Sequence, residues 1–423
     1  MHQPDSDARA RWVLGILLFT YTLNYLDRYL LTILVQPIKD ELHVSDAVMG
    51  FLIGPAFALC YLALGIPIAR LADRASRRAV IAAGFAMWSL FTAACGLARG
   101  WVELAVLRVL VGVGEAAGGA PSHSLLSDTF PPARRAGALS IFQMGVYLGQ
   151  MLGLAVGGLL VAPLGWRWTF IVVGLPGLLF AGLFLATVQE PPRGRFDAPV
   201  SVDPVGGDGE SLVEVIASLW RLRTFRLLVV GSGLAVFAGT GYGFWIPTLF
   251  VRVHAMTLAQ IGVSFGLLSG ASALVGTAVA GRLGVTLGAR DARWLTRLSG
   301  LGVLLSLPFL CGVSLLPNPW IAIACAVPAG LTGAGWAPLA YTVVQNLVPA
   351  HRRAVAASVL MFFMSLLGMG AGPWAVGVLS DLYAPSLGIQ SLRWALVSVL
   401  STSAFGALAL FAAGRSLRDE LAA

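Results

Sequence analysis

The chain has 423 residues, of which 57% are hydrophobic and only 11% charged, and its mean hydropathy is +0.83. A soluble globular domain carries about a quarter charged residues, so this composition excludes a water-soluble protein. Apolar stretches that approach the roughly 20 residues of a membrane-spanning helix recur from Val13 to Gly414. We predict an all-α membrane protein with twelve transmembrane helices.

The net charge of +8 does not indicate nucleic-acid binding, because of where the basic residues lie. With the N-terminus assigned to the cytoplasm, 21 of the 28 lysines and arginines fall in inner loops and five in outer loops. Cytoplasmic loops of membrane proteins carry this excess of positive charge. The pattern predicts a multi-pass inner-membrane protein with both termini in the cytoplasm. The four cysteines lie in apolar stretches without metal-like spacing, so we expect no metal site.

A few charged residues fall inside predicted spans, where a charge costs a few kcal/mol or more and indicates a functional site. Asp27 and Arg28 lie in the first span, and Arg108, Glu115 and His123 in the fourth. Spacings of seven and eight residues keep the latter three on one side of a helix. A carboxylate that is half desolvated near an arginine can titrate at accessible pH. The alternative for these residues is a buried ion pair that only fixes helix packing, and for His123 a single hydrogen bond.

The loop between the second and third spans contains Asp73, Arg74, Arg77 and Arg78. A positive inner loop explains the arginines, but it does not explain a carboxylate among them. A carboxylate at a helix end, facing arginines of the other half, predicts an inward gate that breaks on opening. The corresponding stretch of the second half has Val285 where an acid would fall, which predicts asymmetric gating charge.

The chain divides into halves that repeat. Residues 190–209 are rich in Pro, Gly, Asp and Arg, and residues 210–223 have the pattern of an amphipathic helix on the inner membrane surface. We therefore predict six-helix bundles at 1–189 and 224–423, joined by a cytoplasmic linker at 190–223. The loop at 130–140 recurs at 348–358, and Arg135 and Arg353 are 218 positions apart. Parallel repeats of this kind build two-bundle transporters.

Four glycines in the predicted fifth span, Gly145, Gly149, Gly153 and Gly157, are spaced four residues apart. Small residues at this spacing let helix backbones approach closely. We expect them to pack against a neighbouring helix. The alternative is a face on which helices slide during a conformational change.

The loop at 65–78 and the two-fold repeat resemble the major facilitator superfamily, although Ala69 and Ser76 stand where its signature loop usually has glycine. Residues 24–28, 108–116, 121–128 and 166–170 resemble the spinster-like branch, and the first of these is also similar to organic anion–cation symporters. The spinster resemblance implies lysophospholipid or sphingosine-phosphate transport. It also implies a proton site at Asp27, with Arg28 as its partner, and a cavity acid at Glu115. The superfamily resemblance implies a monomer.

These observations together predict a proton-coupled transporter of an amphipathic anionic lipid that works by alternating access, with a small organic anion as the alternative substrate. The predicted proton-coupling residues are Asp27 and Glu115. The predicted substrate-binding residues are Tyr25, Arg28, Arg108, His123, Trp245, Trp336 and Tyr341. The predicted gating residues are Asp73, Arg74, Arg77, Arg78, Asp128, Arg134 and Arg135. An enzyme is not expected, because histidine is scarce and no nucleophile cluster or phosphate-binding loop occurs, and no cofactor is expected.

Overall fold

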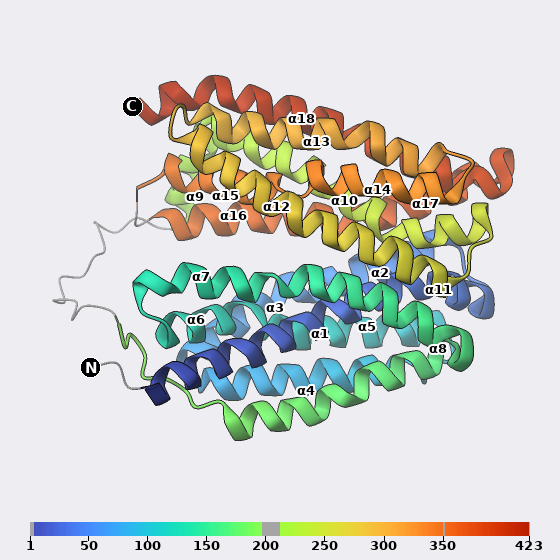
Figure 1. The fold of residues 1–423 in the computed structure, drawn as a ribbon, viewed down its shortest axis with the longest axis horizontal. Helices are drawn as coiled ribbons and strands as arrows, with labels where there is room; N and C mark the ends of the chain where they lie inside the picture. The colour runs from blue at the N-terminus through green and yellow to red at the C-terminus, as the bar shows by residue number, and fades with distance from the viewer. Residues whose placement is uncertain (1–3, 197–211, 350–351, 423) are drawn as a thin grey trace. The chain divides into compact units, whose positions relative to one another are not determined.

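The computed structural model describes residues 4–196, 212–349 and 352–422, and all regular structure in those residues is helical (Figure 1). The chain forms two compact units. Unit 1 consists of Met1–Val44, Ala56–Asp203 and Leu258–Gly266, and unit 2 of Ser45–Pro55, Pro204–Thr257 and Leu267–Ala423. This division differs from the predicted boundaries in two short segments that are exchanged between the units. Part of the predicted linker, residues 197–211, lies outside the described residues.

In unit 1 the long helix α8 packs against α1 and against α4 (Figure 1). The helices of unit 1 are α1 (Pro4–Leu42), α3 (Pro55–Arg74, in unit 1 from Ala56), α4 (Arg77–Cys95), α5 (Trp101–Ala116), α6 (Gly119–Thr129), α7 (Pro132–Gln143), α8 (Gly145–Thr187), α11 (Leu258–Ile261) and the π-helix η1 (Gly262–Gly266). The long helix α8 is two helices that meet at Gly165, whose φ of 73° is outside the helical range.

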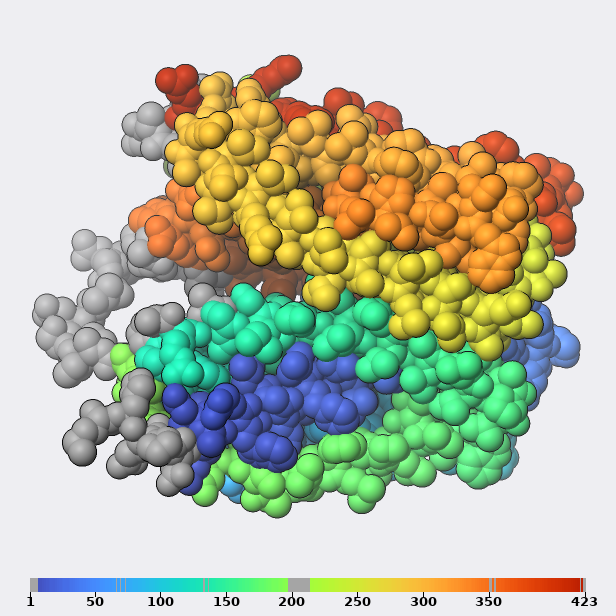
Figure 2. All heavy atoms as spheres, viewed as in Figure 1, coloured from blue at the N-terminus to red at the C-terminus, as the bar shows by residue number. Residues whose placement is uncertain are grey.

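Unit 2 has the same all-helical construction, and with all heavy atoms drawn its helices α12, α13 and α14 form a continuous surface (Figure 2). Its helices are α2 (Asp46–Ile53), α9 (Leu212–Arg221), α10 (Arg223–His254), α12 (Leu267–Gly288), α13 (Arg293–Leu315), α14 (Pro319–Gly333), α15 (Trp336–Leu347), α16 (Arg353–Ser365), the π-helix η3 (Leu366–Ala371), α17 (Gly372–Leu387), the 3₁₀ helix η4 (Gly388–Gln390) and α18 (Ser391–Ala422).

Helices form throughout because a backbone in hydrocarbon must satisfy its own hydrogen bonds. Eight stretches of the described residues are long and apolar enough to cross a membrane. Two of them, Gly137–Thr187 with 51 residues and Val355–Arg418 with 64, are long enough to cross more than once. The helices of the described residues are consistent with the twelve predicted crossings.

The short helix α2 is fixed to α17 within unit 2 by charge. Both carboxylate oxygens of Asp381 accept backbone N–H groups at the start of α2, from Asp46 at 3.0 Å and Ala47 at 2.7 Å. The Asp46 carboxylate, itself buried, receives two hydrogen bonds from Arg252 of α10, at 2.6 and 2.7 Å. Helix α2 ends at Gly54, where φ is −99° and ψ −90°, and α3 begins at the next residue, Pro55. A proline at the first position of a helix gives up no intrahelical hydrogen bond.

The helix α9 covers the core of unit 2. Val215 and Leu219 are buried in a cluster with Phe225 of α10, and the Trp220 ring meets Phe363 of α16 edge-on. The predicted amphipathic pattern is therefore present, and its apolar face packs on protein.

The glycine face of α8 packs against α1, as the four-residue spacing predicted. A Cβ added at Gly149 would lie 2.5 Å from the carbonyl oxygen of Thr22, and one added at Gly153 would lie 2.6 Å from that of Leu26. Real Cβ atoms do not come this close, so these two helices meet backbone to backbone. The close contact fixes the stretch of α1 that carries Asp27 and Arg28.

We expect the substitution Gly149→Ala to lower the midpoint of thermal unfolding in detergent, because the added methyl group would overlap α1 and overpacking costs about 1–3 kcal/mol. Gly15→Ala, on the same pair of helices, is the matched control, since nothing lies within 4 Å of its added Cβ. That variant should be as stable as the wild type or slightly more stable. Equal midpoints for the two variants would contradict the packing described above.

Candidate functional site

Two ion pairs connect α1 to α5 inside unit 1. Arg28 Nε lies 2.6 Å from Glu115 Oε2, and Arg108 Nη1 lies 3.1 Å from Asp27 Oδ2. All four residues are at least nine-tenths buried, and Asp27 has no exposed surface. The structure therefore brings together four of the residues predicted in the first and fourth spans, as two pairs of opposite charge. The fifth, His123, is not part of these pairs.

The arrangement follows from helix geometry. Arg108 and Glu115 are seven residues apart, so both project from one side of α5, about two turns from each other. Asp27 and Arg28 are adjacent on α1, where Asp27 pairs with Arg108 and Arg28 with Glu115. Gly112, between the two α5 residues, has no side chain, and a Cβ there would lie 2.7 Å from the carbonyl oxygen of Phe57. The glycine thus lets α3 approach the same point.

Aromatic rings surround the guanidinium group of Arg28. Its Cζ atom lies 4.7 Å from the ring centre of Tyr25, 4.8 Å from that of Phe57 and 5.0 Å from that of Tyr61. Cations are attracted to the faces of aromatic rings at these distances, most strongly where water is excluded. The rings add to the stabilisation that Glu115 gives to this charge.

Each ion pair leaves buried polar atoms without a protein partner. These are Oδ1 of Asp27, Nε of Arg108 and Oε1 of Glu115. A buried ion pair repays its desolvation only where the remaining polar atoms are also satisfied. The two pairs are therefore costly to the fold, and a change in the charge of one member alters the energy of the whole group.

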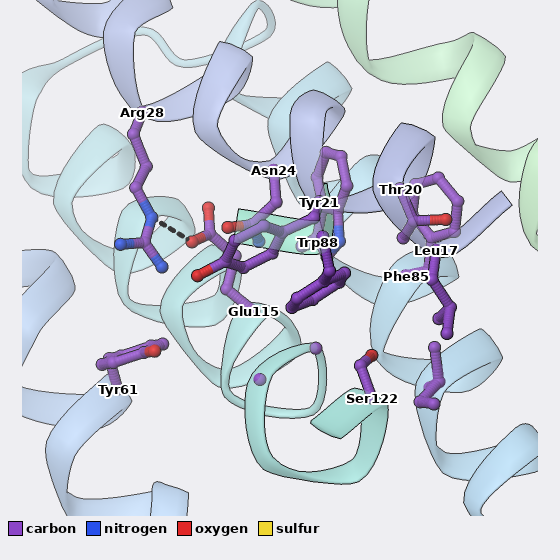
Figure 3. Close-up of a pocket in the computed structure, with 14 residues that line it drawn as sticks. Leu17, Thr20, Tyr21, Asn24, Arg28, Tyr61, Phe85, Trp88, Glu115 and Ser122 are labelled. Carbon is purple, nitrogen blue, oxygen red and sulfur yellow. Dashed lines mark hydrogen bonds and ion pairs between the residues drawn. The ribbon is translucent and has the colours of Figure 1, made fainter. Parts of the chain in front are cut away.

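A pocket in unit 1 opens beside the Arg28–Glu115 pair (Figure 3). It encloses about 390 Å³ of atom-free space, part of which is open to solvent. Rings from four helices form much of its wall, and Thr20, Asn24 and Ser122 supply uncharged polar groups. The lining residues are Leu17, Thr20, Tyr21, Asn24, Arg28, Tyr61, Ile81, Phe85, Trp88, Glu115, Gly118, Gly119, Ser122 and Phe142.

The predicted substrate residues fall into different environments. Arg28 and Arg108 form, with Asp27 and Glu115, a charged group of four buried side chains, and Tyr25 contacts Arg28. Of the three predicted residues, Arg28 lines the pocket and the other two do not. His123 is half-buried next to the pocket-lining Ser122, and its ring meets that of Phe142 edge-on at 5.4 Å. His123 itself does not line the pocket.

The aromatic residues predicted on the second half lie in unit 2. Trp245 is fully buried, and its indole N–H donates to the carbonyl oxygen of Pro373 at 2.8 Å. In this structure Trp245 is therefore a packing residue and not part of a pocket wall. Trp336 and Tyr341 are half-buried and pack against the core of unit 2.

Sequence reasoning missed Phe57, Tyr61, Phe85 and Trp88, although all four lie against the charged group or the pocket. They stand in apolar stretches typical of any membrane helix, so nothing in the sequence marks them. The one available signal was position, since aromatic residues near an intramembrane arginine are expected to stabilise it.

The predicted gating residues form contacts within unit 1. Arg77 is buried at the start of α4 and pairs with Asp128 of α6 and, at 3.1 Å, with Glu190, which follows α8. Arg78 donates to the carbonyl oxygen of Val188 at 3.1 Å. Whether any of these groups also acts as a gate between the halves stays a prediction.

The remaining gating candidates are less constrained. Arg134 makes an exposed pair with Asp7, at 3.1 Å, and Arg74 is exposed. The backbone of Asp73 lies in α3, and its side chain is outside the described part of the structure. Arg135 is half-buried.

The segment after α8 closes over this end of unit 1. Gly194 N–H donates to Asp128 Oδ1 at 3.1 Å, and Arg193 donates to the carbonyl oxygens of Ala72 and Ala75 at 2.8 and 2.7 Å. Glu190 accepts from the Ser76 hydroxyl and from the backbone N–H of Arg77, so it caps the start of α4. Glu190 belongs to none of the motifs found in the sequence, so it was not predicted as a functional residue.

With this geometry established, the chain was compared with known proteins. The family model described as Major Facilitator Superfamily matches residues 17–373. The chain belongs to the Major Facilitator Superfamily. Members of this superfamily are transporters, so the prediction that the chain is not an enzyme is confirmed.

Relatives within the superfamily support the spinster-like assignment. The chain is 31% identical to an MFS-type efflux pump of Mycolicibacterium smegmatis, over 99% of this chain and 96% of that protein. It is 29% identical to the sphingosine-1-phosphate transporter SPNS2 of Danio rerio, over 94% and 83% of the two chains. The crystal structure of a bacterial homologue of the human lysosomal transporter spinster, inward-facing and unoccupied, matches with a TM-score of 0.89 and 28% identity, over 99% of both chains. The predicted resemblance to the spinster-like branch of the superfamily is confirmed.

The substitution Arg108→Gln should destabilise this superfamily member strongly, because it leaves the Asp27 carboxylate buried without its partner. Breaking a buried ion pair from one side costs about 3–5 kcal/mol. Adding Asp27→Asn should restore most of the loss, as a double-mutant cycle of thermal unfolding in detergent would measure. Arg134→Gln, which breaks an exposed pair, is the control and should cost about 0–1 kcal/mol. An additive double mutant would show that the two side chains do not interact.

We expect Glu190 to stabilise the protein in a pH-dependent way. Burial opposes its ionisation, but hydrogen bonds from Ser76 and from the backbone and side chain of Arg77 outweigh burial and lower the pKa of Glu190 below its ordinary value of 4.5. A lowered pKa in the folded state adds stability above pH 4.5, and this stability is lost as the pH falls through the folded pKa.

The measurement is the difference in unfolding midpoint between the wild type and Glu190→Gln across this range. The difference should be constant near neutral pH and shrink below about pH 4.5. Its size should be modest, since the carboxylate is largely exposed. A difference that does not change with pH would assign the effect of Glu190 to shape alone.

Proposed function

We propose that this protein is a proton-coupled secondary active transporter that moves an amphipathic anionic lipid, such as a lysophospholipid or a sphingosine-phosphate-like molecule, by alternating access. The observation that carries the proposal is the pair of buried acid–arginine contacts beside a pocket, Arg28–Glu115 and Arg108–Asp27. Superfamily membership supplies the transport function, and this site supplies the proposed coupling and the proposed substrate chemistry.

The proposed coupling is a competition for Arg28. When Glu115 is ionised, its Oε2 holds the guanidinium group at 2.6 Å. A proton on Glu115 removes the negative charge, and the guanidinium is then free to bind an anionic headgroup in the pocket. Proton and anion therefore favour each other's binding, and such a linkage is reciprocal. Asp27, fully buried against Arg108, is the second proposed proton site and shares the same electrostatic environment.

The pocket fits a headgroup better than a whole lipid. Its wall combines one arginine with the neutral polar groups of Asn24 and Ser122 and with the rings of Tyr21 and Trp88. The enclosed part of this space is small, so a headgroup would enter only as the pocket widens, and an acyl chain would stay outside. The Danio rerio relative is named for sphingosine-1-phosphate, a molecule with such a headgroup and one chain. Trp336 and Tyr341 of unit 2 stay proposed substrate contacts.

A small organic anion is the second candidate substrate, because Arg28 could bind a carboxylate equally well and the enclosed space suits a small molecule. The charge asymmetry of the sequence supports an inner-membrane location with both termini in the cytoplasm, and the superfamily supports a monomer.

The proposal is tested with purified protein in liposomes that carry an imposed pH gradient, with lysophosphatidylglycerol as the transported lipid. We expect gradient-driven lipid flux that Asp27→Asn and Glu115→Gln each reduce at least about tenfold, since either change removes a titrating group. Arg293→Gln serves as the control and should transport normally, because its ion pair with Asp291 is partly exposed and lies outside the proposed site. Folded protein that moves no lipid but moves a small carboxylate would shift the assignment to organic anions. Undiminished pH-driven flux in both acid variants would remove the coupling site from unit 1.

A further inference from the structure

The Phe57 ring contacts both arginines of the charged group. Its centre lies 4.8 Å from Cζ of Arg28 and 5.5 Å from Cζ of Arg108. Tyr25 and Tyr61 contact Arg28 in the same way, and neither has such a contact with Arg108 in the described structure. Phe57 is 2% exposed, so the ring and both guanidinium groups share an environment without bulk water. The two ion pairs are thus joined through one aromatic side chain.

Phe57 also lies at a break in the chain. Helix α2 ends at Gly54, whose backbone is outside helical geometry, and α3 begins at Pro55. Phe57 is the third residue of α3. Helix α2 is held in unit 2 by Asp381, and α3 from Ala56 onward belongs to unit 1. The carbonyl group of Phe57 packs on Gly112 of α5, which lies between Arg108 and Glu115 in the sequence.

We propose that Phe57 is a positioning residue that couples proton binding at Asp27 to anion binding at Arg28. The inference rests on the proposed function and adds a residue that transmits between its two ion pairs.

One ring contacts two cations, so a stronger contact with one of them weakens the contact with the other. A proton on Asp27 removes the charge that holds Arg108, and the Arg108 guanidinium then gains more from the face of Phe57. The ring turns towards Arg108 and gives up part of its contact with Arg28, which loosens the Arg28–Glu115 pair and favours an external anion. Without the ring, the two pairs lose their only shared side chain among the described residues.

All titratable groups near this ring are part of the same environment. They are Asp27, Arg28, Tyr21 and Tyr25 on α1, Tyr61 on α3, Cys95 on α4, and Arg108 and Glu115 on α5. Asp27 and Glu115 are the only carboxylic acids among these groups. A coupling that depends on pH must therefore start at one of these two acids.

The test counts protons taken up when lysophosphatidylglycerol binds to the purified transporter, by calorimetry in buffers of different ionisation enthalpy. The wild type should take up about one proton per lipid at a pH where the acids titrate. The ring variants are compared in a Glu115→Gln background, where Asp27 is the proposed proton site that remains. There Phe57→Leu should bind the lipid within about threefold of its parent and take up almost no proton, whereas the parent should still take one up. Tyr61→Leu is the matched control: it should bind more weakly and keep the parent's proton count.

Two further variants separate a structural effect from coupling. Phe57→Tyr keeps the ring and should keep the proton count, and Phe57→Met removes the ring at similar volume in case the leucine variant does not fold. The parent's count in Phe57→Leu or Phe57→Met overturns the role of Phe57 and leaves the proposed function standing. An equal loss of protons in Tyr61→Leu overturns it too. A wild-type protein that binds lipid without any proton overturns the proposed coupling, and with it the role of Phe57.

Discussion

Four buried charges in an apolar helical bundle are the constraint on which the arrangement of unit 1 depends. A carboxylate or guanidinium group in hydrocarbon is tolerated only next to an opposite charge. Asp27 and Arg28 on α1 meet Arg108 and Glu115 on α5, and these contacts determine the rotation of both helices about their axes. Rings from α1 and α3 then close over Arg28, which explains why aromatic residues gather at this point.

Glycines at the helix contacts allow the close approach of backbones that positions the four buried charges. Helices that met through large side chains would hold the backbones of α1 and α8 too far apart, and α1 would lose its fixed position. Gly149 and Gly153 let α8 touch the backbone of α1 on one side, and Gly112 lets α3 touch α5 on the other. The charged group is therefore held between two backbone contacts, which is how an ion pair with unsatisfied atoms keeps one geometry.

The sequence was sufficient for the fold class and for the identity of the charged residues, because hydropathy and intramembrane charge are properties of the chain itself. It did not determine which acid pairs with which arginine, since Asp27 could have met Arg28 or Arg108. It gave no sign of Phe57 or Tyr61, because an aromatic residue in an apolar helix has the same pattern whether it faces lipid or an arginine. Nor does any pattern predict that the indole N–H of Trp245 donates to the carbonyl oxygen of Pro373, and its role in substrate binding stays a prediction.

The two units satisfy their buried polar groups in different ways, and this has a consequence for mechanism. In unit 2, Tyr242 donates to the carbonyl oxygen of Leu310 and Thr240 to that of Gly368, and both oxygens of the buried Asp46 carboxylate accept hydrogen bonds from Arg252. In unit 1, the pairs on α1 and α5 leave one oxygen of Asp27 and one of Glu115 without a hydrogen bond among the described residues. Proton binding at the α1–α5 pairs would therefore act directly on the energy of unit 1.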